Sequence, residues 1–169
     1  AVYAQAEPVI AAYARICRCL GASGAGQIAK MMNQIAIAGL VQGLADAHKA
    51  RTGADVAVGC HVEPGIDLPE AAKICIYRFV QEGLNNGWRH AEGRGQAVHL
   101  RLMGDDLTLT VADRGPGFIA APPGAGADGT TLGLAGLADR VESLGGQFTA
   151  RNRAGGGAEL TMTLDLRGL

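Results

Sequence analysis

The chain has 169 residues, a hydrophobic fraction of 48% and a formal net charge of −1. This length fits one domain, or one domain with a small appendage, and the apolar fraction is sufficient for a real core. The small net charge argues against a nucleic-acid partner bound through bulk electrostatics. Because there is no stretch near the ~20 apolar residues of a membrane span and no signal peptide, we expect a cytoplasmic protein.

The cysteines and glycines narrow the class further. The four cysteines, Cys17, Cys19, Cys60 and Cys75, include no Cys-x-x-Cys pair. Two of them lie within apolar patterns, so we expect buried free thiols in a reducing compartment rather than a metal site. The 26 glycines have no collagen-like period, which indicates loops where the backbone approaches another group closely.

Residues 1–52 are predicted to form a helical N-terminal segment. Residues 9–16 are rich in Ala with apolar residues at helical spacing, and the Gly-rich residues 21–26 interrupt this pattern. A longer apolar periodicity follows over residues 27–51, and Gly53 is a natural C-terminal cap for it. Two helices joined by a short Gly-rich loop would form a helical hairpin.

Residues 53–169 contain alternating strand and helix patterns. Strands are predicted at residues 56–62, 98–102, 107–111 and 160–166, and helices at residues 70–91 and 134–144. A turn at Gly104 joins the two middle strands as a hairpin. The predicted fold class is α/β, a two-layer sandwich of a mixed sheet covered on one face by helices.

The helix at residues 74–91 has two different faces. Apolar residues recur every fourth position on one face, and an acid, an amide and two potential cations share another: Ile76, Val80 and Leu84 against Glu82, Asn86, His90 and the neighbouring Arg89. Asn is a poor helix former, so its oxygen is expected to serve another group. Mg²⁺ is a good candidate because it prefers few, hard oxygen ligands and completes its shell with water and phosphate. A solvated polar face is the alternative for this helix alone.

Three Gly-containing motifs follow this helix. Residues 113–118 read Asp-Arg-Gly-Pro-Gly-Phe, residues 133–136 read Gly-Leu-Ala-Gly at the predicted start of a helix, and residues 155–157 are all Gly. A carboxylate at a strand end, as at Asp113, can accept a hydrogen bond from an exocyclic amine, and unpaired amides at a helix start attract phosphate. Each motif also has a purely structural alternative. Residues 113–118 fit a β-turn, residues 133–136 fit a loop entering a helix, and residues 155–157 fit a hairpin turn.

In this order and spacing, the Asn86 helix and the Gly motifs resemble the ATP-binding domain of sensor histidine kinases. This domain belongs to the GHKL superfamily, which also includes type II topoisomerases, Hsp90 and MutL. The wording is closest to the nitrate-sensor and desaturase-sensor branch, where the helix resembles VQEALTNALRHA and the later stretch resembles GLxGMxERVxxLGG. The resemblance covers roughly residues 39–166. It implies a Bergerat ATP-binding fold in residues 53–169, preceded in residues 1–52 by part of a dimerisation hairpin and connector.

The resemblance implies that the chain binds ATP and Mg²⁺, with specific roles for its residues. Asn86 would be the magnesium ligand, and Glu82 the general base or the group that polarises a metal-bound water. Asp113 would bind the adenine amino group. Residues 119–132 would be the ATP lid. The other nucleotide contacts would come from Arg89, His90, Gly115, Gly117, Gly133, Leu134, Gly136 and Gly156.

The sequence also departs from the family pattern. None of its four histidines, His48, His61, His90 and His99, is followed by an acid, so the chain has no obvious phospho-acceptor. Gly83 and Gly87 replace the usual Ala, with Trp88 beside them. Two mid-helix glycines cost on the order of 1 kcal/mol each relative to Ala. They would also open space for closer packing or for a ligand, and the sequence does not decide between these.

The predicted function is the catalytic domain of a two-component sensor histidine kinase. It would transfer the γ-phosphoryl group of ATP to a histidine on a dimerisation domain, for relay to a response regulator, and would act as a homodimer. One alternative is an ATP-hydrolysing switch of the topoisomerase or Hsp90 kind, in which Glu82 activates water. The wording of residues 140–146 argues against it. The other alternative is a degenerate nucleotide-binding or dimerisation module without kinase activity, which the missing acceptor keeps open.

Overall fold

The computed structural model describes residues 25–62, 68–118 and 129–168. Within these ranges the chain forms three α-helices, five strands and a short 3₁₀ turn. In chain order they are α2 (Ala25–Thr52), β1 (Val56–Val62), α3 (Glu70–Ala91), β2 (Gln96–Met103), β3 (Asp106–Ala112), α4 (Gly129–Glu142), β4 (Gln147–Asn152), β5 (Ala158–Asp165) and η1 (Leu166–Gly168).

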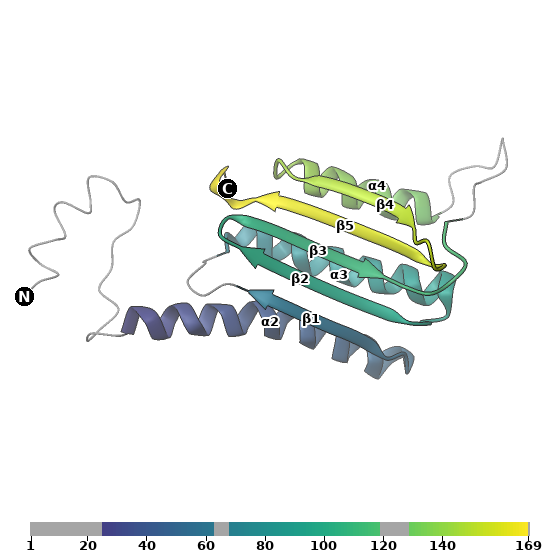
Figure 1. Ribbon diagram of the computed structural model, residues 1–169, viewed down its shortest axis with the longest axis horizontal. Helices are drawn as coiled ribbons and strands as arrows, with labels where there is room; N and C mark the ends of the chain where they lie inside the picture. The colour runs from purple at the N-terminus through teal and green to yellow at the C-terminus, as the bar shows by residue number, and fades with distance from the viewer. Residues whose placement is uncertain (1–24, 63–67, 119–128, 169) are drawn as a thin grey trace, which may run out of the picture.

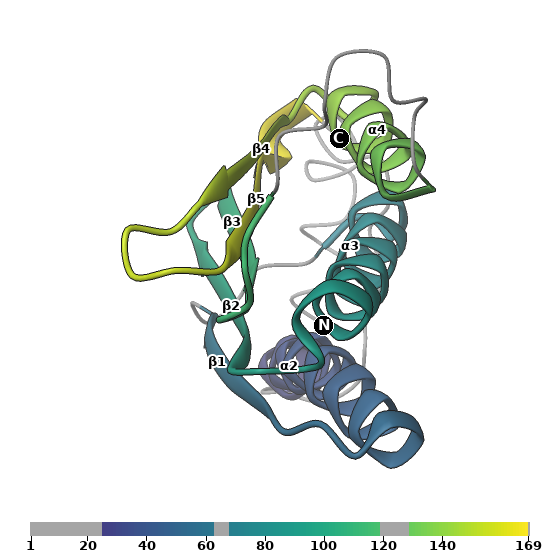
Figure 2. The ribbon, with the colours of Figure 1, turned by 90° about the vertical axis from the view of Figure 1, so that its right-hand side faces the viewer.

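The strands form one mixed sheet in the order β1-β2-β3-β5-β4. β1 and β2 pair in parallel, because α3 crosses over between them, whereas the other three pairings are antiparallel. The three helices lie side by side on one face of the sheet, as Figure 2 shows from the side. The predicted two-layer α/β sandwich is therefore confirmed.

The core lies between the sheet and the helices, with α3 in the middle of the helical layer (Figure 1). Phe79 of α3 is fully buried and meets Phe148 of β4 edge to face, with ring centroids 6.1 Å apart. The second half of α2 belongs to the same core, because Ile37 and Val41 join the hydrophobic cluster that contains Phe79 and Met162. The end of α2 is thus held firmly against the sandwich.

The two glycines of α3 lie where the helix approaches other groups closely. A Cβ on Gly83 would lie 2.9 Å from Cγ1 of Val111 on β3, and a Cβ on Gly87 would lie 2.6 Å from Nε2 of Gln96 on β2. Both glycines are buried. Close packing against the sheet, rather than free space for a ligand, explains why α3 tolerates two poor helix formers.

Most elements agree with the sequence-based predictions, and four points differ or extend beyond them. The predicted helices at 27–51 and 70–91 are confirmed as α2 and α3, and the predicted strands as β1, β2, β3 and β5. β4 was not predicted. α4 begins at Gly129, so the last four residues of the predicted lid are helical. Cys60 is exposed, contrary to the expectation of a buried thiol, because β1 is an edge strand; Cys75 is buried. The predicted helix at 9–16 lies outside the described residues.

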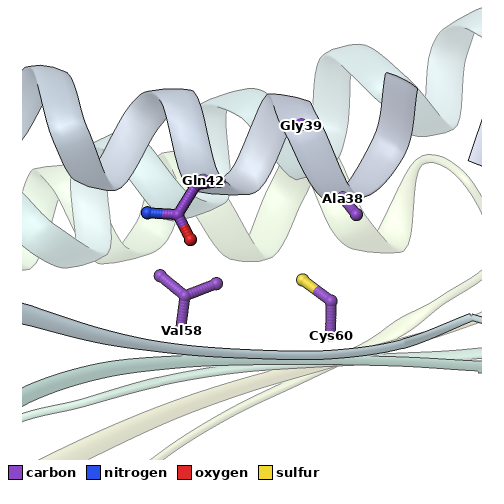
Figure 3. A pocket seen from close by; sticks show the side chains of 5 residues that line it. All are labelled: Ala38, Gly39, Gln42, Val58 and Cys60. Carbon is purple, nitrogen blue, oxygen red and sulfur yellow. The ribbon is translucent and has the colours of Figure 1, made fainter. Parts of the chain in front are cut away.

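A cavity of about 390 Å³ lies between α2 and β1, lined by Ala38, Gly39, Gln42, Val58 and Cys60 (Figure 3). None of the predicted nucleotide-binding residues lines it. Among the described residues, no helix has both the length and the apolar composition to cross a membrane.

Candidate nucleotide site

Asp113 immediately follows β3, and backbone groups hold its side chain. Its Oδ1 accepts hydrogen bonds from the amides of Gly115, at 2.8 Å, and Ala158, at 3.2 Å. Oδ2 has no hydrogen-bond partner among the described residues. One oxygen therefore fixes the carboxylate, and the other remains able to accept a bond from a ligand amine.

The loop between β4 and β5 closes on the backbone of Asp113. The guanidinium Nη1 of Arg153 donates to the Asp113 carbonyl at 3.0 Å. Gly156 and Gly157 both have positive φ, and a Cβ on Gly157 would collide with the carbonyl of Asp113. Glycine is required at residue 157 both for its backbone conformation and for this approach. The loop thus fixes the backbone of Asp113.

The segment after Asp113 is also fixed closely. A Cβ on Gly115 would collide with Ala91 at the end of α3. Phe118 is held by Asn152 of β4, whose Oδ1 accepts from the Phe118 amide at 2.6 Å and whose Nδ2 donates to the Phe118 carbonyl at 3.1 Å. Gly117, with a φ of 78°, lets the chain turn beside that side chain. Asn152 therefore anchors the chain where the predicted lid begins.

Asn86 has an unusual environment on α3. Its Oδ1 and Nδ2 atoms are both buried, and neither has a hydrogen-bond partner among the described residues. An unpaired buried carboxamide costs free energy, so such a group calls for a ligand. The next residue, Gly87, lies against Asp113, because a Cβ there would be 3.5 Å from the Asp113 Cβ. The turn of α3 that carries Asn86 therefore adjoins the Asp113 carboxylate.

Glu82 lies one turn earlier and faces α4. A Cβ on Gly133 would lie 3.0 Å from the Glu82 Oε1 atom, so α3 and α4 meet at this carboxylate. Gly133 and Gly136 do not open α4, contrary to the prediction, because the helix begins one turn earlier at Gly129. The Gly133 amide is thus beyond the first four residues, whose amides lack helical partners. Gly136 is exposed with no group near it, and Leu134 packs partly against the core.

Arg89 and His90 lie in the exposed last turn of α3. Cations are favourable there because the helix dipole is negative at its C-terminus. The helix ends at Glu92, which has a left-handed conformation and donates its amide to the Gly87 carbonyl. Among the described contacts none joins Arg89 to Asp113, and both Arg89 and His90 are exposed at this end of α3.

The structure brings together most of the predicted site residues. Asp113, Gly115, Asn86 and Gly156 lie around one end of the sheet, and Glu82 and Gly133 lie on the side toward α4. Residues 119–128 of the predicted lid are outside the described residues. Asn152 and Arg153 support this site from β4 and its loop, and neither was predicted from the sequence. A polar or basic residue immediately before a Gly-rich hairpin is too common a pattern to have identified them.

The sequence of this domain matches a known protein family. Residues 72–168 match the family model described as histidine kinase-, DNA gyrase B-, and HSP90-like ATPase. Because this match covers more than half of the chain, the protein belongs to that family. Its resemblance to histidine kinases, inferred above from three motifs, is confirmed.

The relatives narrow the class to histidine kinases. The chain is 28% identical over 106 residues to the signal transduction histidine-protein kinase/phosphatase DegS of Brevibacillus brevis, which covers 63% of this chain and 26% of DegS. It is 35% identical over 92 residues to UhpB of Salmonella typhimurium, another such kinase/phosphatase, covering 53% of this chain and 17% of UhpB. The full-length ShkA structure in complex with AMPPNP has a TM-score of 0.61 at 21% identity, covering 79% of this chain and 30% of ShkA. The protein carries the ATP-binding catalytic domain of a histidine kinase, and spans only about a quarter or less of these curated relatives.

Proposed function

We propose that this domain binds Mg-ATP between α3, α4 and the end of β3, and transfers the γ-phosphoryl group to a histidine on a partner segment. A response regulator then takes the phosphoryl group from that histidine. The family, the fold and the adjoining polar groups support this proposal. We expect three partners: a dimerisation domain that carries the histidine, a second copy of the chain, and a response regulator. The response regulator is expected to be cytoplasmic, because phosphoryl transfer of this kind needs ATP and its acceptor in one compartment.

In this proposal, each polar group has a specific role. Asp113 accepts a hydrogen bond from the adenine amine through the oxygen that the backbone does not use. Asn86 supplies an oxygen to Mg²⁺ and an amide that donates to phosphate. When bound, Mg²⁺ would offset negative charge on the phosphates. Glu82 lies one turn from Asn86, where it orients a water or takes a proton from the incoming group. Arg89 and His90 provide positive charge or donors at the border.

The observation that carries the proposal is the buried, unpaired carboxamide of Asn86. A structural Asn in a helix would turn to solvent or bond to a neighbour, and this residue does neither within the described chain. Its oxygen and nitrogen fit a hard cation and a phosphate together, which is the combination that Mg-ATP presents. For an asparagine that served only packing, burying both of these polar atoms without partners would be a net cost.

Calorimetric titration tests the proposal. The wild type should bind ATP more tightly with Mg²⁺ than with a chelator. Asn86→Leu should lose this magnesium-dependent part of the binding while keeping affinity for adenosine, and Asn86→Asp, which retains an oxygen, should keep more of it. Gln81→Leu, at a half-buried position of the same helix whose side chain bonds only to Tyr77 and Arg78 within the described chain, is the matched control. Equal ATP affinity of the wild type with and without Mg²⁺ would refute the metal role.

One observation also favours the hydrolytic alternative. The Glu82 carboxylate faces the first turns of α4, where a water beside the terminal phosphate could be held. A switch would release phosphate continuously from Mg-ATP, a kinase domain without its acceptor would turn over little, and a degenerate module would neither bind nor hydrolyse. Measuring phosphate release together with binding separates the three.

A further inference from the structure

His48 and Gln96 are the two polar residues that are buried as a whole among the described residues, and they bond to each other. His48 in the last turns of α2 is 4% exposed, and Gln96 at the start of β2 is 2% exposed. The Nε2 atom of His48 lies 2.9 Å from the Oε1 atom of Gln96. A buried hydrogen-bonded pair of this kind needs a specific mutual geometry, since an unpaired partner would be costly.

The Gln96 amide connects this pair to α3. Its Nε2 atom donates to the carbonyl of Leu84 at 2.7 Å, which directs its oxygen toward His48. His48 must therefore carry its proton on Nε2. Its Nδ1 atom is then an acceptor and faces the Arg51 guanidinium at 3.3 Å. Gly87 makes room for the Gln96 amide, because any Cβ there would lie 2.6 Å from the amide nitrogen.

Arg51 makes a second, direct link between the same helices. Its Nη2 atom donates to the Oδ1 atom of Asn85 at 2.5 Å. Asn85 immediately precedes Asn86, and Leu84 precedes Asn85. The last turns of α2 are therefore tied by two polar links to the one turn of α3 that carries the unpaired carboxamide. An isolated exposed hydrogen bond is worth little, but the buried link beside it fixes the position of the guanidinium.

We propose that His48 and Arg51 are positioning residues for the magnesium-nucleotide site. They hold the Leu84–Gly87 turn at one orientation relative to α2, and so determine where the Asn86 carboxamide points. A rotation or shift of α2 would break the Arg51–Asn85 link first and lower the affinity for Mg-ATP. The proposal rests on the proposed role of Asn86. It assigns the end of α2 an indirect role in nucleotide binding, in which α2 need not contact ATP.

The test compares Arg51→Ala, Asn85→Ala, their double mutant and the wild type. Arg51→Ala is expected to weaken Mg-ATP binding about two- to tenfold and leave adenosine affinity unchanged. The double mutant should be no weaker than the worse single mutant, because both remove one link. Arg51→Lys, which keeps a donor, should restore part of the affinity. Lys49→Ala is the matched control, since Lys49 lies in the same turn but pairs with Asp55 at 2.6 Å.

Amide hydrogen exchange of the nucleotide-free protein provides an independent readout. Exchange in residues 83–88 should accelerate in Arg51→Ala and not in Lys49→Ala, and ¹⁵N spectra should show His48 protonated on Nε2. Unchanged exchange together with equal Mg-ATP affinity in Arg51→Ala and Lys49→Ala would overturn the proposal. If the wild type binds no Mg-ATP, the proposed function fails, and the exchange comparison alone decides whether the two residues position this turn.

Discussion

The two oxygens of Asp113 have different neighbours, and this difference defines its role. Backbone amides from Gly115 and Ala158 both donate to Oδ1, while no described group donates to Oδ2. Asn86 is the complementary case, because its side chain has no described partner at all. A carboxylate fixed by one oxygen and a carboxamide without a partner are both prepared for a ligand that carries donors at one end and phosphate at the other.

Asp113→Asn should reduce ATP affinity without unfolding the protein. The Asn oxygen can still accept from Gly115 and Ala158, so the loop keeps its bonds. The new amide group would oppose the adenine amine with a second donor, at a cost of about 1–3 kcal/mol, or roughly five- to 150-fold in affinity. Calorimetry with ATP measures this, and Asp105→Asn in the β2–β3 turn is the control. Comparable ATP affinity in all three proteins would show that Asp113 does not bind adenine.

His48 should make the stability of the domain depend on pH. Burial lowers the pKa of His48 below its ordinary value of 6.5, the hydrogen bond with Gln96 raises it, and the nearby positive charge of Arg51 lowers it further. The unfolded chain therefore binds a proton at pH values where the folded chain does not. The free energy of unfolding should fall as the pH drops below about 6.5, and level off below the lowered pKa.

Chemical denaturation between pH 5 and pH 8 tests this dependence. His48→Gln removes the titrating group, so its free energy of unfolding should vary less over this range, whatever its absolute stability. His61→Gln, at an exposed position of β1, is the control and should retain the slope of the wild type. A slope that persists in His48→Gln would assign the dependence to other groups.

At the scale of elements, the position of α3 on the sheet depends on its two glycines. Gly83→Ala gains about 1 kcal/mol of helix propensity but places a methyl group 2.9 Å from Cγ1 of Val111, a buried β-branched side chain with restricted χ1. Overpacking costs about 1–3 kcal/mol, so we expect net destabilisation of up to about 2 kcal/mol. Gly43→Ala on α2, where nothing lies within 4 Å, should stabilise by up to about 1 kcal/mol. Thermal and urea unfolding would show the opposite signs, and stabilisation by Gly83→Ala would contradict the packing argument.

The elements that the sequence predicted are those whose apolar period is complete. β2, β3 and β5 alternate, and α3 shows a stripe every fourth residue, so their core faces are readable. β4 was missed because it is an edge strand on which Phe148 is the one large apolar residue, and its burial has no alternation. The start of α4 was misplaced because residues 129–132 have no periodicity. Periodicity reports burial, and β4 is too exposed to show it.

The candidate site was predictable only in part, for a related reason. Asp113 and Asn86 belong to local motifs whose residue types suggest chemistry. Asn152 and Gln96 act through contacts with residues 34 and 48 positions away, at Phe118 and His48. Such pairings exist only once the sheet is formed, and nothing in the local sequence distinguishes them from ordinary polar surface residues.

At the scale of the whole molecule, α2 is joined to the nucleotide site through the sheet and through α3. Its second half contributes Ile37 and Val41 to the core, and its last turns contribute His48 and Arg51 to the polar links. If these links position the Asn86 turn as proposed, nucleotide affinity depends on the orientation of α2.

The same packing predicts that this chain does not phosphorylate itself at His48. Phosphoryl transfer requires an imidazole nitrogen in line with the γ-phosphorus, and positioning supplies most of the catalysis. His48 is 4% exposed, with Nε2 bonded to Gln96 and Nδ1 directed at Arg51, so neither nitrogen can attack. Incubated with Mg-ATP, the chain should bind nucleotide but gain no acid-labile, base-stable phosphate. Adding a separate dimerisation domain that carries an accessible histidine should allow transfer. Phosphohistidine at His48, found by mass spectrometry, would contradict this prediction and would require α2 to leave its place against β1 and α3 during the reaction.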